Sequence, residues 1–214
     1  FYHHFDIIKG DEKIPPSLTV RVCDSVTCEI NGANELAQNL DDYFKGTVRI
    51  QKVPCIGRCQ SAPVAVVKFN PIDNANLKNV KQAVDAKEYN PSIPEYINMK
   101  EYIDKGGYKL FNKLKNNEID SDKVLTELES SNLRGLGGAG FPAGKKWRIL
   151  KDQPSPRLLA INIDEGEPGT FKDRFYLEMD PHRFFEGMLI ASEVVGIDKV
   201  YIYLRDEYAA VRTL

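Results

Sequence analysis

Two pairs of cysteines, each directly after a strand-like run, constrain this chain more than any other feature of its sequence. Cys23 and Cys28 follow "LTVRV" with four residues between them, and Cys55 and Cys59 follow "VRIQKVP" with three. A redox dithiol needs a spacing of two. Nothing in the sequence indicates secretion, which disfavours disulfides and leaves buried unpaired thiols as the alternative to a metal site. We expect a metal site, because two loops at one edge of a sheet could bring the four thiols together.

The segment from residue 18 to 69 alternates strand-like and helix-like patterns. "LTVRV", "TVRIQKV" and "PVAVVKF" read as strands, and "GANELAQNLDDYF" has apolar residues at helical spacing, with Asn31 or Asn34 as its N-cap. A helical stretch follows at 76–87. Two prolines in "EYNPSIPEY" then break the pattern. We expect a small α/β unit that ends near residue 90.

The second half of the chain predicts a different arrangement. The segment 100–131 is helical, with an interruption at Gly106 and Gly107 and with Asp120 or Ser121 as a later cap. After a glycine-rich stretch come the strand "RLLAINI", a polar acidic turn, the helix "PHRFFEGMLIASEVVG", the strand "KVYIYL" and the first turns of another helix. This order is typical of a parallel βαβ arrangement.

The spacing of the cysteines favours an iron–sulfur cluster over zinc. Structural zinc sites prefer short C-x2-C pairs, and both pairs here are wider. Gly57 and Arg58 offer backbone N–H groups that can donate to cluster sulfurs. The run "VRVCDSVTCEINGANEL" with "VPCIGRCQSAPVAVV" resembles the thioredoxin-like [2Fe-2S] module of the small flavoprotein subunit of respiratory complex I and its relatives. That resemblance implies that the cluster is ligated by Cys23, Cys28, Cys55 and Cys59.

The glycine-rich stretch "SNLRGLGGAGFPAGKKW" predicts an anion-binding loop. Its "GLGGAG" satisfies G-x-G-x-x-G at Gly135, Gly137 and Gly140, but a dinucleotide fingerprint must follow a strand, and "VLTELESSNLR" before it reads as a helix. Successive glycine N–H groups beside two lysines and two planar side chains suit a flat, phosphorylated cofactor. A flexible connector between helices is the alternative.

The acidic turn "INIDEGEPGTFKDR" follows the strand "RLLAINI". Its carboxylates, Asp164, Glu165 and Glu167, come at the carboxyl end of a strand, where open α/β sheets place ligands. A solvated loop is the alternative, although two glycines and a proline shape the turn tightly.

Together, "LRGLGGAGFPAGKKW" and "NIDEGEPGTFKDR" resemble the FMN- and NADH-binding subunit of complex I and its soluble relatives over residues 125–214. The resemblance implies a Rossmann-like α/β domain that binds FMN and NAD. It implies that the FMN phosphate and ribityl chain are held by Gly135, Gly137, Gly138, Gly140 and Lys146, with Arg134 as a further cofactor-binding residue. It places Asn162, Asp164 and Glu165 on the flavin side of the site, and Phe141 and the catalytic carboxylate Glu167 toward the nicotinamide nucleotide.

The expected fold class is therefore α/β, with a thioredoxin-like [2Fe-2S] domain followed by the first part of a Rossmann-like FMN/NADH-binding domain. We expect the first domain at 1–90, a linker with helical character at 91–124 and the truncated second domain at 125–214. The abrupt start "FYHHF" and the helix-like end suggest a fragment of a longer chain.

Fusion of the two modules is typical of NAD-dependent formate dehydrogenases and NAD-reducing hydrogenases. The runs "NIDEGEPGTFKDRFYLEMDPHRF" and "VYIYLRDEY" resemble most the β subunit of the molybdenum or tungsten formate dehydrogenases. This resemblance implies electron transfer between NAD(H), FMN and iron–sulfur clusters, coupled to formate oxidation by a catalytic partner subunit. The alternatives are the diaphorase subunit of an NAD-reducing hydrogenase, a subunit of NADH:quinone oxidoreductase, other electron-transfer partners and a non-catalytic, zinc-stabilised scaffold.

The balance of charge argues against some other partners. With 29 basic and 31 acidic side chains the chain has a net charge of −2, so nucleic acid is not expected as a partner. No apolar run approaches the roughly 20 residues needed to cross a bilayer, so we expect no direct membrane insertion and a cytoplasmic location.

Overall fold

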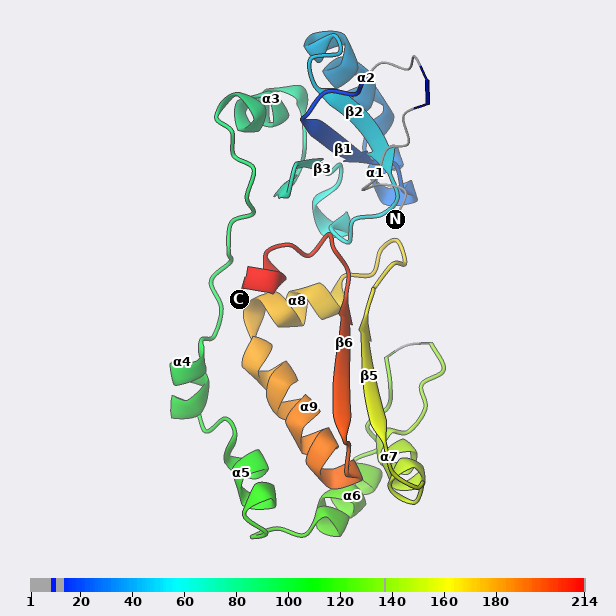
Figure 1. The fold of residues 1–214 in the computed structure, drawn as a ribbon, viewed down its shortest axis with the longest axis vertical. Coiled ribbons are helices and arrows are strands. Elements are labelled where there is room, and N and C mark those ends of the chain that lie inside the picture. Colours follow the sequence, from blue (N-terminus) through cyan, green and yellow to red (C-terminus); the bar gives the residue numbers. More distant parts are fainter. Residues whose placement is uncertain (1–8, 11–13, 137, 214) are drawn as a thin grey trace. The chain divides into compact units, whose positions relative to one another are not determined.

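The computed structural model describes residues 9–10, 14–136 and 138–213 and divides the chain into two compact units. The first unit comprises the residues up to Pro94 together with Asp164–Phe175 and Arg205–Leu214. The second comprises Glu95–Ile163 and Tyr176–Leu204. Two late segments of the chain therefore belong to the first unit. Figure 1 follows these segments by their colour along the sequence. The opening "FYHHF" lies outside the described residues.

The first unit is built on a four-stranded sheet in the order β2-β1-β3-β4. Its strands are β1 (Thr19–Cys23), β2 (Arg49–Val53), β3 (Ala65–Val67) and β4 (Asn70–Ile72). β1 and β2 are parallel, whereas β3 is antiparallel to both β1 and β4. The strands expected from "LTVRV", "TVRIQKV" and "PVAVVKF" are present, and β4 adds an edge that the sequence pattern had not indicated.

Helices cover this sheet because their apolar residues fall on one face. The helical elements of this unit are α1 (Val26–Ile30), α2 (Ala33–Phe44), α3 (Leu77–Asp85) and the 3-10 turn η1 (Cys59–Ser61). Leu36, Leu40 and Phe44 of α2 are buried, and α2 packs against β1 and β2 while α3 packs against β3. The small α/β unit expected for this part of the chain is therefore present.

The predicted N-cap of α2 was wrong. Gly32, with φ of 88°, precedes the helix and makes no side-chain cap. Asn31 instead ends α1, where its side chain donates to the carbonyl oxygen of Thr27. In α3, by contrast, Asn76 and Asn79 form a capping box, so each satisfies a backbone N–H of the other.

The second unit combines a two-stranded parallel sheet with helices. The elements are α4 (Met99–Asp104), α5 (Lys109–Lys115), α6 (Ser121–Ser130), α7 (Ala143–Lys151), β5 (Leu158–Ile163), α9 (Pro181–Val195) and β6 (Lys199–Leu204). β5 and β6 pair in parallel along their whole lengths, and the chain between them forms the predicted crossover. Both α4 and α5, from the segment expected as a linker, pack against α9.

The core of this second unit lies among its helices. Leu114, Leu125 and Val194 are buried together, and Trp147 and Ile190 pack against them. The caps were predicted well: Asp120 accepts from the amide of Asp122 at the start of α6, and Gly196 ends α9 with φ of 72°.

Two elements differ from the sequence pattern. The acidic turn is followed by a helix that was not expected, α8 (Lys172–Met179). Conversely, a helix was expected at the end of the chain. The described residues there form two non-helical turns and a short 3-10 segment, η2 (Val211–Thr213), instead. Non-local contacts of Glu165 and Arg205, described below, account for both. No helix in the described part of the chain has the length and apolarity to cross a membrane.

Candidate functional site

The parallel pairing of β1 and β2 brings the two cysteine loops to the same edge of the sheet. Cys23 ends β1 in register with Val53, which ends β2 just before Cys55. Cys28 lies in α1, and Cys59 begins η1. The convergence expected from the sequence is therefore produced by strand register.

The four thiols form a chain of contacts in a protected place. Cys23, Cys28 and Cys55 are buried and Cys59 is partly exposed. The sulfur atoms of Cys55 and Cys59 are 3.4 Å apart. Hydrogen bonding with Cys28 raises the pKa of the Cys23 thiol, and hydrogen bonding with Cys23 raises the pKa of Cys55. Thiols in such contact suit a shared inorganic centre, whose positive charge would favour the thiolate ligands.

Backbone amides point at two of these sulfurs. The N–H of Gly57 donates to Cys55 Sγ at 3.4 Å, and the N–H of Gly169 donates to Cys59 Sγ at 3.1 Å. Such N–H···S bonds surround the sulfurs of iron–sulfur clusters and help to set their potentials. Four cysteines with amide donors therefore fit a [2Fe-2S] cluster. The described residues include no group of three or more His, Cys, Asp or Glu arranged around one metal ion, and each iron of a [2Fe-2S] cluster needs only two thiolates.

The Cys55–Cys59 loop is anchored by two buried arginines from later in the chain. Arg205 donates from Nη2 to the carbonyl oxygen of Cys55 at 2.6 Å, and Arg174 donates from Nε to the carbonyl oxygen of Gly57 at 3.0 Å. The ring of Tyr208 lies against Gly57, which has φ of 73°. None of these three anchors is predictable from the sequence, because no local pattern links residues so far apart.

The same loop is also braced within its own domain. Arg58 forms a bidentate pair with Asp73, with distances of 2.7 and 2.9 Å. Burial opposes ionisation of this carboxyl, yet the Arg58 guanidinium holds its pKa below the usual range.

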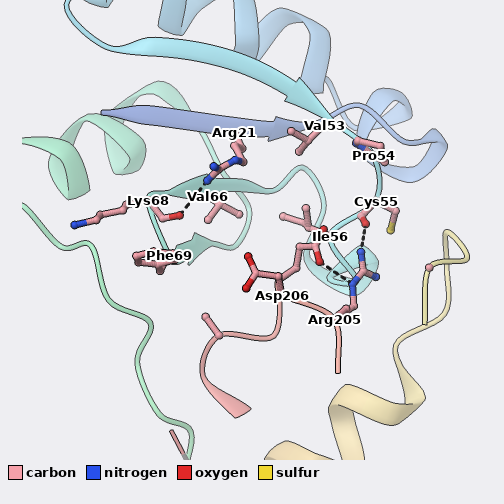
Figure 2. A pocket seen from close by; sticks show the side chains of 13 residues that line it. Arg21, Val53, Pro54, Cys55, Ile56, Val66, Lys68, Phe69, Arg205 and Asp206 are labelled. Carbon is pink, nitrogen blue, oxygen red and sulfur yellow. Dashed lines mark hydrogen bonds and ion pairs between the residues drawn. The ribbon is translucent and has the colours of Figure 1, made fainter. Parts of the chain in front are cut away.

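A cavity of about 200 Å³ lies beside Cys55 within the first unit (Figure 2). Its wall combines apolar side chains of the sheet end with Arg21, Lys68, Arg205 and Asp206. The Nη1 of Arg21 donates to the carbonyl oxygen of Lys68 at 3.3 Å. Cations and carboxylates both line the cavity, so it has no single electrostatic preference.

The acidic turn after β5 is organised by Glu165. Its side chain is completely buried, and its oxygens accept from the amides of Asp173 at 2.8 Å and Arg174 at 3.2 Å. The hydroxyl of Tyr208 donates to the same carboxylate at 2.8 Å. Burial opposes the charge, but these donors and Lys172 lower the pKa of Glu165. A carboxylate at the first amides of α8 also interacts favourably with the helix dipole, which explains why α8 begins here.

The other predicted residues of this turn differ from Glu165 in exposure. Asp164 and Glu167 are exposed, whereas the carboxylate of Glu165 is not. The structure thus separates three carboxylates of one turn into a buried helix cap and two solvent-facing groups.

In the second unit, the glycine-rich stretch forms a closed loop. Gly135 N–H donates to the carbonyl oxygen of Phe141 at 3.0 Å, and Arg134 Nη1 donates to that of Gly140 at 3.0 Å. Gly138 and Gly140 have φ of 68° and 57°, a conformation that glycine adopts without strain. Gly137 lies outside the described residues.

This loop opens into the N-terminus of α7. Phe141 and Lys146 are exposed, at the end of the loop and in the first turns of the helix respectively. Exposed glycines, a helix N-terminus and a lysine together fit the phosphate of a flavin nucleotide. Asn162 lies near the end of β5, also exposed.

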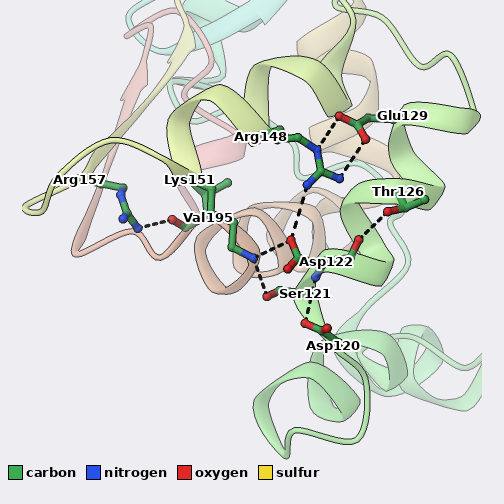
Figure 3. A network of polar contacts seen from close by, with 9 residues as sticks. All are labelled: Asp120, Ser121, Asp122, Thr126, Glu129, Arg148, Lys151, Arg157 and Val195. Atoms are coloured by element: carbon green, nitrogen blue, oxygen red, sulfur yellow. Dashed lines mark hydrogen bonds and ion pairs between the residues drawn. The ribbon is translucent and has the colours of Figure 1, made fainter.

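Ion pairs between α6 and α7 fix the base of the loop (Figure 3). Arg148 of α7 holds Glu129 of α6 at 2.8 and 2.9 Å, and Lys151 donates to Ser121 and Asp122. Gly144 is buried where the two helices meet, so this glycine serves helix packing.

Two protein families match successive parts of the chain. Residues 1–88 match the family described as "Thioredoxin-like [2Fe-2S] ferredoxin", and residues 128–213 match the "Nuo51 FMN-binding domain" of the Complex1_51K family. The chain therefore has a thioredoxin-like [2Fe-2S] domain followed by an FMN-binding domain.

Two relatives that match part of the chain are NADH oxidoreductase proteins. An NADH-quinone oxidoreductase polypeptide of Aquifex aeolicus is 44% identical over 117 residues, which are 55% of this chain and 27% of that protein. The mitochondrial NADH-ubiquinone oxidoreductase 51 kDa subunit of Neurospora crassa is 47% identical over 92 residues, or 41% of this chain and 19% of that one. The chain thus spans less than a third of the length of these relatives.

A solved structure resembles both domains at once. In the crystal structure of an air-oxidised NAD⁺-reducing [NiFe]-hydrogenase, one chain matches with a TM-score of 0.76 and 26% identity, covering 94% of this chain and 40% of that one. The H2-reduced state of an NAD⁺-reducing [NiFe]-hydrogenase gives a TM-score of 0.75 and 28% identity.

Proposed function

We propose that this chain is part of an electron-transfer flavoprotein subunit that moves electrons between NAD(H), FMN and a [2Fe-2S] cluster. The observation that carries the proposal is the hydrogen bond from Gly169 N–H to Cys59 Sγ. It joins the cysteine site to the turn that follows β5 of the FMN-binding domain. The turn that carries Glu167 is thus bonded directly to a candidate cluster ligand, which supports a shared electron-transfer role for the two sites.

The chain's own residues have separate tasks in this proposal. FMN, when bound, exchanges a hydride with NAD(H) and exchanges single electrons with iron–sulfur centres. The glycine-rich loop, with Arg134 and Lys146, would hold the phosphate and ribityl chain, and Phe141 would pack against the nicotinamide nucleotide. Cys23, Cys28, Cys55 and Cys59 would ligate the cluster.

The acidic turn takes two roles in the proposal. Asn162 and Asp164 would contact the flavin, while Glu167 would accept hydrogen bonds from ribose hydroxyls of NAD(H). The carboxylate of Glu165 is engaged with α8 and Tyr208, so we propose that Glu165 shapes the turn and reaches the flavin side only through its backbone.

For the partner, the comparisons favour a hydrogenase-type diaphorase over formate oxidation. The NAD⁺-reducing hydrogenase chain covers 94% of this chain, so both domains occur in one polypeptide there as well. Formate oxidation, predicted from the resemblance of two sequence runs, stays a prediction, as does a cytoplasmic location.

Spectroscopy of the intact protein tests the proposal. Anaerobic purification should give a flavin spectrum, a [2Fe-2S] EPR signal after reduction by NADH, and NADH-dependent dye reduction. A colourless protein that contains one zinc ion and reduces no dye would instead support the zinc-stabilised scaffold. If the flavin and cluster signals are present, co-purification identifies the partner. A nickel-iron subunit would indicate a hydrogenase, and a molybdenum or tungsten subunit would indicate a formate dehydrogenase.

A further inference from the structure

Three groups from the acidic turn and the segment after β6 hold the Cys55–Cys59 loop. Arg205 binds the carbonyl oxygen of Cys55, Arg174 binds that of Gly57, and the Gly169 amide binds Cys59 Sγ. All three contacts lie within the first unit. The second cysteine loop is therefore held from outside the thioredoxin-like sequence as well as from inside it.

Arg205 links two of these segments directly. Nη2 donates to the carbonyl oxygen of Cys55 (Figure 2), while Nη1 donates to that of Glu165 at 2.8 Å and Nε pairs with Glu207 at 3.2 Å. The two carbonyl groups come from the cysteine loop and from the turn that carries Gly169. A planar guanidinium can bridge them in fixed geometry, whereas a lysine ammonium offers only a single point of charge.

The turn itself is rigidly supported. Glu165 has φ of 44°, an uncommon conformation for a residue other than glycine. Its buried carboxylate is held by two amides of α8 and by the hydroxyl of Tyr208. Gly169 lies in the same turn, four residues after Glu165, so the fixed Glu165 limits where the Gly169 amide can lie.

We propose that Arg205 is a positioning residue that keeps the Gly169 amide on Cys59 Sγ and thereby raises the reduction potential of the [2Fe-2S] cluster. An amide that donates to a ligand sulfur stabilises the extra negative charge of the reduced cluster. Loosening the turn lengthens that bond and makes the potential more negative. This inference rests on the proposed function, since it requires the cluster.

The test uses the intact protein with its cofactors and compares Arg205→Lys with Arg205→Gln. The readouts are cluster occupancy, the EPR spectrum and the midpoint potential of the cluster, with the FMN potential measured in the same samples. Arg212→Gln is the matched control, because Arg212 is an exposed arginine that pairs with Asp206 at 2.7 Å. We expect a negative shift of the cluster potential in both Arg205 variants, with the FMN potential and the control unchanged.

The lysine variant separates position from charge. If the cluster in Arg205→Lys has the same midpoint potential as in the unaltered protein, the proposal is overturned. The positive charge of residue 205 would then be sufficient, and the geometry of the guanidinium would have no effect on the potential. If both Arg205 variants fail to retain the cluster, Tyr208→Phe decides. This change removes the hydroxyl from Glu165 but keeps the ring against Gly57, and it should shift the potential in the same negative direction. No shift in Tyr208→Phe would then overturn the inference.

Failure of the proposed function gives a different result. In that case the unaltered protein would show no [2Fe-2S] signal at all. A normal signal with potentials that are insensitive to Arg205 and Tyr208 would refute only the positioning role.

Discussion

The ring of Tyr208 lies so close to Gly57 that the glycine has no room for a side chain. A Cβ atom on Gly57 would lie 2.7 Å from Cε1 of Tyr208, well inside van der Waals contact. Gly57 also has φ of 73°. The cysteine loop thus depends on glycine for two reasons, steric and conformational.

Gly57→Ala should therefore lower the stability of the cluster loop by more than backbone strain alone would. The matched control is Gly46→Ala, because Gly46 has a similar φ of 77° but open space around its Cα. Strain costs about 1–2 kcal/mol in both variants, and overpacking adds about 1–3 kcal/mol at Gly57 only. Thermal unfolding and iron content measure the difference. Equal losses in the two variants would refute the steric role of Tyr208.

A second prediction concerns the independence of the two cofactor sites. Cys55→Ser removes a thiolate but keeps the backbone carbonyl that accepts from Arg205, so the acidic turn should remain anchored. We expect loss of most of the [2Fe-2S] signal with FMN content nearly unchanged in the intact protein. Iron and flavin analysis of the same sample measures both. Equal loss of both cofactors would show that the sites depend on each other.

Gly144 gives a prediction for the base of the flavin loop. A Cβ atom there would lie 2.6 Å from the backbone nitrogen of Glu129, so Gly144→Ala must push α6 and α7 apart. We expect a loss of about 1–3 kcal/mol in the free energy of unfolding, together with weaker FMN binding. Gly187→Ala is the control, since Gly187 of α9 has nothing within 4 Å of that position. That change should be neutral or stabilising by up to about 1 kcal/mol. Urea unfolding and flavin titration compare the pair.

The buried carboxylate of Glu165 predicts a pH dependence. Its pKa is lowered in the folded protein, so the stabilisation is present above the unfolded value of about 4.3 and is lost as pH falls through the folded pKa. Hydrogen exchange at the amides of Asp173 and Arg174 should be faster in Glu165→Gln than in the unaltered protein at neutral pH. That difference should shrink below about pH 4. Glu129→Gln, which alters an exposed pair in the second unit, should leave both amides unaffected.

Elements with a local signal were predictable from the sequence, and those held by distant groups were not. α9 carries its own proline start and glycine end, and α6 has its aspartate cap, so both were found. α8 takes its cap from Glu165, which precedes it across the turn, and no local pattern announces that contact.

The same reasoning applies to the site. The cysteines were recognisable because their spacing is short and specific. Arg205 was not, because 150 positions separate it from Cys55 and only the fold brings the two together. The unexpected 3-10 ending has the same origin, since Arg205 and Tyr208 hold that segment in the first unit.

The exposed carboxylate of Glu167 is the basis of a prediction about the preference for NAD over NADP. Its neighbour Asp164 is also exposed, so the turn presents negative charge to an incoming ligand. A carboxylate accepts well from a ribose diol and repels a 2′-phosphate, which favours NAD over NADP. In the intact protein, Glu167→Gln should raise the KM for NADH, leave FMN content nearly unchanged and partly relax discrimination against NADPH.

Steady-state dye reduction with each nucleotide, with flavin counted by absorbance, measures these effects. Glu35→Gln is the matched control, because Glu35 is an exposed glutamate of α2, on the thioredoxin-like domain. The control should behave like the unaltered protein. Unaltered kinetics in Glu167→Gln would make Glu167 a solvated residue of the turn, because removing a charge that contacts the ribose cannot leave both nucleotides unaffected. Loss of flavin in that variant would instead place Glu167 on the FMN side of the site.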